Sequence, residues 1–169
     1  LYLAEGNIFT SDGLSSGIEF AFNTNETHLI EEVVNYSKNI LGITPIVKVK
    51  VAKGTQTNCT TVRIFNRLIG IIFNNLFGRD KNIPEWMWHV DSDNFYRGIV
   101  SGMIDGDGHI SDREGEYSIS LTSKRLEHLI YIRCISLRYG IIPSIYYKNT
   151  TLNDIYYTLY SLSWNGDDC

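Results

Sequence analysis

An internal repeat constrains the fold of this chain more than any other feature of its sequence. The tripeptide His-Leu-Ile occurs at residues 28–30 and again at 128–130, and each copy precedes a Gly-Ile-X-Pro segment, at 42–45 and at 140–143. A sequence that recurs at this scale indicates one supersecondary unit used twice. We therefore predict two halves of the same architecture, related by a pseudo-two-fold axis.

Apolar residues in the first half follow patterns typical of half-buried strands and amphipathic helices. We expect a strand at 16–23, a helix from about 25 to 41, strands at 45–51 and 59–65, and a buried closing helix at 67–77. Gly6 and Gly42 are expected to end helices, because glycine readily adopts the left-handed conformation of that position. The side chains expected in the core are those of Ile18, Phe20, Phe22, Leu29, Val33, Tyr36, Ile40, Val47, Val49, Val51, Val62 and Ile64.

The second half is predicted to repeat this order. We expect a helix at about 94–106, a strand at 117–121, a helix from Ser123 to about Tyr139, and strands at 144–149 and 155–162, with no closing helix after them. The fold class is therefore α+β. The predicted division is a first repeat at 1–78, a connector without periodicity at 79–93, and a second repeat at 94–169.

Composition narrows the classes of protein that fit. With 43% hydrophobic and 20% charged residues, and no apolar run near the roughly 20 residues of a membrane span, we expect an intracellular protein without a membrane partner. Cys59, Cys134 and Cys169 are too scattered for a disulfide framework or a metal cluster, which fits a reducing compartment. The formal net charge of -4 speaks against nucleic-acid binding unless the cations gather on one face.

The stretch at 100–108 joins an apolar helical run to two carboxylates flanked by glycines, and residues 1–6 repeat its last part. Glu5 falls where Asp107 falls in the longer copy. Two helices packed side by side would end with these carboxylates close together, where they repel unless cations lie between them. A calcium-binding loop of the EF-hand type is an alternative for 105–116, but its sixth position is Ile110, where that loop requires glycine. A plain acidic turn is the other alternative.

Residues 100–108 resemble the signature of the LAGLIDADG homing endonucleases, and residues 1–6 resemble its last six positions. Residues 81–84, Lys-Asn-Ile-Pro, resemble a short sequence that precedes the second motif in intein endonucleases of that family. The resemblance implies two pseudo-symmetric αββαββ(α) repeats, with paired central helices and curved antiparallel DNA-binding sheets.

The same resemblance implies a catalytic site. Glu5 and Asp107 would each ligate a divalent metal for one DNA strand, Mg²⁺ by preference with Mn²⁺ as a substitute. The carbonyl groups of Ala4 and Gly106 would complete the coordination. Lys81 would reach the active site and orient the attacking water or stabilise developing charge.

The outward side chains of the strands form the expected DNA-binding surface, because a curved ribbon of strands fits the major groove. The alternative is an ordinary solvent face of an antiparallel sheet. The residues expected to contact DNA are Lys48, Lys50 and Arg63 in the first half and Ser118, Ser120, Tyr146, Lys148 and Tyr156 in the second.

The function implied is site-specific, metal-dependent cleavage of both strands of a long, weakly palindromic duplex by a pseudo-symmetric monomer. The resemblance is greatest to the endonuclease domain of an intein, so we expect the chain to be embedded in a longer host protein, although no protein-splicing residues are visible in it. The alternative is a nucleic-acid-binding protein that does not cleave, either a maturase-like RNA binder or an inactive intein remnant. The presence of both acids favours the enzyme.

Overall fold

The computed structural model describes residues 1–11, 13–50, 58–113, 116–152 and 155–165. The chain divides into two compact units, one made of residues 2–81 and the other of Leu1 with residues 82–169. The boundary between residues 81 and 82 lies inside the segment predicted as the connector.

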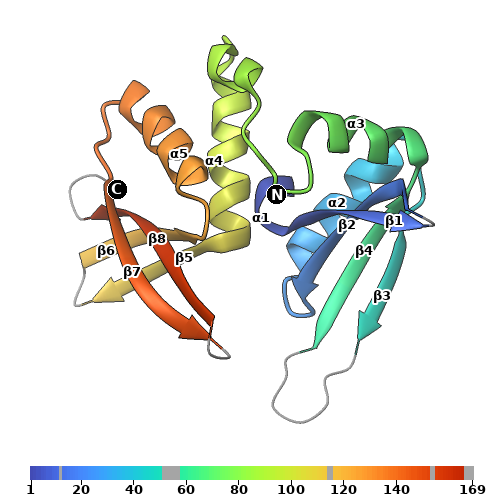
Figure 1. Cartoon of the computed structure of the whole chain (residues 1–169), viewed down its shortest axis with the longest axis horizontal. Helices are drawn as coiled ribbons and strands as arrows, with labels where there is room; N and C mark the ends of the chain where they lie inside the picture. The colour runs from blue at the N-terminus through green and yellow to red at the C-terminus, as the bar shows by residue number, and fades with distance from the viewer. Residues whose placement is uncertain (12, 51–57, 114–115, 153–154, 166–169) are drawn as a thin grey trace. The chain divides into compact units, whose positions relative to one another are not determined.

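The first unit contains a four-stranded antiparallel sheet in the order β1-β2-β4-β3, shown with its helices in Figure 1. Its elements in chain order are α1 (Tyr2–Glu5), β1 (Gly6–Ser11), β2 (Leu14–Asn23), α2 (Thr27–Asn39), β3 (Ile46–Lys50), β4 (Cys59–Phe65) and α3 (Arg67–Phe77).

The second unit contains the same sheet in the order β5-β6-β8-β7. Its elements are the 3-10 helix η1 (Glu85–His89), α4 (Asp93–Asp107), β5 (Gly108–Arg113), β6 (Glu116–Ser123), α5 (Leu126–Arg138), β7 (Ser144–Leu152) and β8 (Ile155–Asn165). The predicted α+β fold with two αββαββ repeats is thus confirmed, and the first repeat is followed by the helix α3.

The first core forms where the strand alternation predicted it. Ile18, Phe20 and Phe22 are buried on one face of β2, and Val62 and Ile64 are buried on β4. The register pairs Phe20 with Val62 and Ile18 with Ile64, so these side chains lie side by side on one face of the sheet. Burial of this face is the main force that holds the helices on the sheet.

The repeated tripeptide and proline segment also has one structure in both halves. Leu29 of α2 and Leu129 of α5 are both fully buried. Gly42 and Gly140 follow these helices with φ angles of 67° and 79°, in the left-handed region where glycine is favoured. The prediction that a glycine ends each of these helices is confirmed.

Several core predictions for the first half are wrong. Tyr36 and Ile40 are exposed, and Ser37 is the buried residue, because the buried stripe of α2 runs 29, 33, 37. Ser37 is tolerated in the core because its hydroxyl donates to the carbonyl oxygen of Ile43 at 2.7 Å.

The strand β3 and the helix α3 are less buried than predicted. Val47 and Val49 are exposed although they lie on the core side of β3, and Val51 lies outside the described residues. The helix α3 forms where predicted, but only Gly70 is buried and Leu68 and Ile72 are exposed. A helix that is apolar on most sides therefore need not be an interior helix.

One local prediction also needs correction. Gly6 does not act as a left-handed helix cap but starts β1, a strand that the sequence patterns did not delimit. The predicted connector contains η1, whose Met87 is almost completely buried. Among the helices in the described ranges, none combines the length and the apolar character needed to cross a membrane.

Candidate functional site

The two acids of the paired motifs occupy the same position in the two repeats. Glu5 is the last residue of α1 and is followed by Gly6, the first residue of β1. Asp107 is the last residue of α4 and is followed by Gly108, the first residue of β5. A Cβ atom on Gly108 would overlap the carbonyl oxygen of Ile104, so glycine allows the chain to turn directly from the helix into the strand.

Lys81 lies against the first motif although the two are far apart in sequence. Its Nζ donates hydrogen bonds to the carbonyl oxygens of Ala4, at 2.7 Å, and Leu3, at 3.2 Å. The last carbonyls of a helix have no partner within the helix, so a cation at this end is stabilising. Lys81 itself has a φ of 52°, a backbone conformation that residues other than glycine rarely adopt.

The donors at each motif are of the kind that a hard divalent cation prefers. Glu5 is half-buried beside the Ala4 carbonyl, and that carbonyl already accepts a hydrogen bond from the ammonium group of Lys81. Asp107 is exposed beside the half-buried Gly106. No group of three or more His, Cys, Asp or Glu residues suited to a metal lies within the described ranges. The set fits Mg²⁺, which is usually held by one or two carboxylates together with water and phosphate oxygens.

The first sheet brings its predicted DNA-binding residues to one face. Lys48 opposes Thr61 and Lys50 opposes Cys59, while Arg63 lies two residues from Thr61 on β4 and so faces the same way. Both lysines are exposed. Arg63 forms an ion pair with Glu19, its cross-strand neighbour on β2. The pair cancels the charge of Arg63, which leaves Lys48 and Lys50 as the unneutralised cations of this face among the residues that the structure describes.

The second sheet brings together four of its five predicted residues. Ser118 and Ser120 of β6 share the outer face with Tyr146 and Lys148 of β7, as the register through Ser161 and Ser163 shows. Tyr156 does not belong to this face. Tyr156 and the buried Leu162 lie an even number of positions apart on β8, and such side chains lie on the same face of a strand. The side chain of Tyr156 is therefore on the core face of the sheet, opposite to the face of Lys148.

Further residues of the same outer face were missed by the sequence reasoning. Ser111 and Ser118 are hydrogen bonded to each other at 2.7 Å, and Thr122 and Ser161 lie 3.5 Å apart. The register also puts His109, Ser144, Thr150, Tyr157, Leu159 and Ser163 on this face. The alternation around Leu162 could have identified the residues on β8, whereas those on β5 required the strand itself to be delimited.

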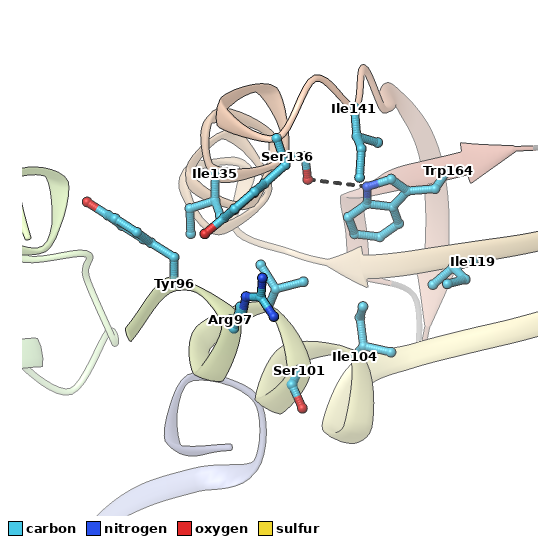
Figure 2. A pocket seen from close by; sticks show the side chains of 11 residues that line it. Tyr96, Arg97, Ser101, Ile104, Ile119, Ile135, Ser136, Ile141 and Trp164 are labelled. Carbon is cyan, nitrogen blue, oxygen red and sulfur yellow. Dashed lines mark hydrogen bonds between the residues drawn. The ribbon is translucent and has the colours of Figure 1, made fainter. Parts of the chain in front are cut away.

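The second half also contains an apolar pocket of about 520 Å³ between α4, α5 and the sheet (Figure 2). Ile104, Ile119 and Trp164 line it. The indole Nε1 of Trp164 donates to the hydroxyl of Ser136 at 3.2 Å. The hydroxyl of Tyr96 is buried without a hydrogen-bond partner in the described part of the chain, and it points away from the pocket.

Comparison with known proteins finds a family model that matches part of the chain. Residues 94–164 match the family model described as a LAGLIDADG-like domain. No curated protein matches the chain in sequence.

Solved structures match the chain along nearly its whole length. The N-terminal LAGLIDADG domain of DUF199/WhiA aligns with 98% of the chain and 71% of its own length, at 12% identity and a TM-score of 0.57. Full-length DUF199/WhiA from Thermatoga maritima gives 12% identity and a TM-score of 0.60, and the chain spans 48% of that protein. The homing endonuclease I-DmoI in complex with DNA and Ca aligns with 97% of the chain and 78% of its own length, at 12% identity and a TM-score of 0.61.

Other structures of I-DmoI or its variants contain DNA together with Mn or Mg. At 12% identity these matches establish the fold. The chain therefore has the fold of the LAGLIDADG proteins, and its residues 94–164 match the model of a LAGLIDADG-like domain.

Proposed function

We propose that this chain is a site-specific endonuclease that binds double-stranded DNA and hydrolyses one phosphodiester bond in each strand with the help of divalent metal ions. The observation that carries the proposal is the equivalence of Glu5 and Asp107, each the last residue of a helix that turns through a glycine into the first strand of its sheet. An acidic turn without a function would not need to recur at the same point of both repeats.

The chemistry requires an attacking water, neutralisation of the charge on the phosphate and stabilisation of the leaving oxygen. A bound Mg²⁺ would supply Lewis acidity for these tasks. Glu5 and Asp107 would each provide a carboxylate to a metal ion at their own motif, and the carbonyl groups of Ala4 and Gly106 would provide neutral oxygen donors there. Lys81 contributes a fixed positive charge next to the first motif, where it stabilises charge that develops on the phosphate.

The sheets supply the DNA-binding surface in this proposal. A negative protein can bind a polyanion if its cations are gathered on one face, and Lys48 and Lys50 are gathered in this way on the first sheet. The I-DmoI complexes with DNA support the proposal by analogy of fold. The proposal includes a long, weakly palindromic target cut by a monomer, because the two repeats are similar but not identical. It also includes a longer, intein-type host protein of which the chain is a part.

The decisive experiment selects a cleavable site and then removes the acids one at a time. A randomised duplex library cloned into a plasmid is incubated with the protein and Mg²⁺ or Mn²⁺, and linearised plasmids are recovered and sequenced. On a recovered site, Glu5→Gln and Asp107→Asn are expected to abolish double-strand cleavage, with at most residual nicking, and to retain binding in a gel-shift assay.

Asp105→Asn is the matched control, because Asp105 precedes the motif acid by two residues on the same helix and accepts a hydrogen bond from Ser101 at 3.1 Å. It is expected to cleave like the parent. Full double-strand cleavage by Glu5→Gln or Asp107→Asn would refute the assignment of the acids. A parent protein that binds DNA but cuts no library member with either metal would instead establish a non-cleaving binding protein.

A further inference from the structure

The outer faces of the two sheets differ in chemistry although their strands are equivalent. The face of the first sheet has two exposed lysines, Lys48 and Lys50, and a neutralised ion pair. The described strands of the second face have one lysine, Lys148, among a larger set of hydroxyl groups, and a second lysine, Lys124, has its ammonium group held over the ring of Tyr157 at 4.7 Å. This set consists of Ser111, Ser118, Ser120, Thr122, Ser144, Tyr146, Thr150, Tyr157, Ser161 and Ser163. A single repeated unit has therefore acquired two different surfaces.

We propose that the two halves bind the duplex through different forces. The first sheet anchors DNA phosphates through Lys48 and Lys50, and the second sheet reads base edges through its hydroxyl groups. This division of labour rests on the proposed function. It adds that the salt dependence of binding arises mainly in the first half and the sequence preference mainly in the second.

The lysines of the first face suit phosphates because they are charged, exposed and close in sequence on one strand. Each cation that neutralises a phosphate releases condensed counterions and adds about 0.9 to the slope of log affinity against log salt. Arg63 adds little to this slope, because its guanidinium is already paired with Glu19 and stacks near the ring of Phe9. The net cationic charge of the face therefore resides on β3, where the strand has both faces exposed.

The hydroxyl groups of the second face suit base edges for the opposite reason. A hydroxyl can donate or accept, and it rotates to meet either kind of atom, whereas a lysine only donates. Ser111 and Ser118 already form a hydrogen bond across neighbouring strands, which shows that hydroxyls on this face lie within bonding distance of one another. Neutral groups release no counterions, so contacts made by them depend little on salt.

The test measures both quantities on the same set of variants. Fluorescence anisotropy follows binding of a labelled duplex, either the selected site or a scrambled site of the same composition, in EDTA between about 50 and 200 mM salt. The first variant is Lys48→Ala/Lys50→Ala, and its control is Lys38→Ala, an exposed lysine in the last turn of α2 rather than on a sheet. The second variant is Ser118→Ala/Ser120→Ala/Ser161→Ala.

The control for the serine variant is Thr151→Val/Thr158→Val, which removes hydroxyls from the opposite face of the same sheet. Circular dichroism confirms that each variant is folded. The lysine variant is expected to reduce the salt slope by about 2 and to weaken both duplexes equally. The serine variant is expected to keep the slope, to weaken the selected duplex by about 10- to 100-fold and to leave the scrambled duplex unchanged. The two control variants are expected to bind like the parent.

Equal changes of slope in the two variants, or equal losses on the two duplexes after serine removal, would overturn the division of labour while leaving DNA binding established. A parent that binds neither duplex would overturn the proposed function itself, and this inference with it.

Discussion

The two halves repeat the same elements but complete their cores differently. In the first half, α3 lies over the sheet, with Phe73 and Phe77 against the ring of Tyr2 at centroid distances of 4.5 Å and 5.2 Å. Gly70 of α3 comes so close to Gly17 of β2 that a Cβ atom on Gly70 would lie 2.7 Å from the Gly17 nitrogen. Two glycines thus let a helix rest directly on a strand.

In the second half, the equivalent positions line the pocket. Ile104 precedes its motif acid by three residues, as Tyr2 precedes Glu5. Ile119 opposes Trp164 in the second register where Ile18 opposes Ile64 in the first. The place that α3 covers in the first half is therefore an apolar pocket in the second. Within the described residues, the sheet and its two helices have the same arrangement in both halves, and α3 is the element that covers this face in the first half.

The equivalent helices α2 and α5 also differ in how many of their residues are buried. Six residues of α5 are buried but only three of α2. The helix α5 therefore contributes more buried residues to the core of the second half than α2 contributes to the core of the first. All three tryptophans, Trp86, Trp88 and Trp164, belong to the second unit. Tryptophan fluorescence therefore reports on that unit alone, and each half can be observed separately.

The largest effect is expected from the paired leucines of the repeat. Leu29→Ala and Leu129→Ala each remove a fully buried side chain, at a cost of about 3 kcal/mol of unfolding free energy. In urea unfolding, Leu129→Ala should lower the midpoint of the tryptophan fluorescence transition, whereas Leu29→Ala should lower the midpoint by far-ultraviolet circular dichroism and leave the fluorescence midpoint nearly unchanged. If both variants shift the fluorescence equally, the two units unfold as one and the comparison fails.

The next effect concerns the close contact under α3. Gly17→Ala should cost about 2 to 3 kcal/mol, because its Cβ atom would overlap the carbonyl oxygen of Ile64 at a φ of 156°. The matched change is Ser118→Ala at the equivalent position of β6, where there is room for a side chain, and it should cost about 1 kcal/mol for the lost hydrogen bond to Ser111. Thermal unfolding by circular dichroism measures both. A larger loss in Ser118→Ala would mean that the two positions are not equivalent.

A smaller, pH-dependent effect is expected in the second core. Burial raises the pKa of Tyr131 to about 12, with Tyr96 adding to the rise and Arg138 opposing it. The unfolded state loses its tyrosine proton near pH 10, before the folded state does, so the unfolding free energy should fall by about 1 to 2 kcal/mol between pH 10 and pH 12 and be unaffected by this group below pH 9. Fluorescence-monitored urea unfolding at each pH measures the fall.

Tyr131→Phe is the control for this effect. It removes the hydrogen bond from the hydroxyl to the Met87 carbonyl, 2.8 Å long, and lowers stability at neutral pH. It should also make the alkaline fall shallower, because the titrating group is gone. An alkaline fall of the same size in this variant would assign the effect to other groups.

The last effect concerns the rate of DNA cleavage. Lys81 contacts the first motif, and its proposed role is in the transition state, so Lys81→Met should slow cleavage of one strand about 10-fold, or about 1.4 kcal/mol, with DNA affinity nearly unchanged. Nicked plasmid should therefore accumulate before linear plasmid appears. Equal loss of binding and rate would make Lys81 a phosphate anchor instead.

Much of the fold could be predicted because the signals were local. The alternation of Ile18, Phe20 and Phe22 fixed which face of β2 is buried, and each His-Leu-Ile segment marked a helix with a buried leucine. The paired acids could be placed at equivalent helix ends, since the motif and its glycine are contiguous. The prediction for α3 failed because sequence periodicity reports the apolar character of a helix and not how much of it a neighbour covers.

The sequence by itself determined the repeat, the α+β class, the positions of Glu5 and Asp107, and the alternation of side chains along most strands, since all of these follow from spacing within one element. Only the tertiary structure decided what depends on residues far apart in the chain. It placed Lys81 on the Ala4 carbonyl and paired Arg63 with Glu19. These contacts are set by strand register and loop path, which a local pattern does not encode.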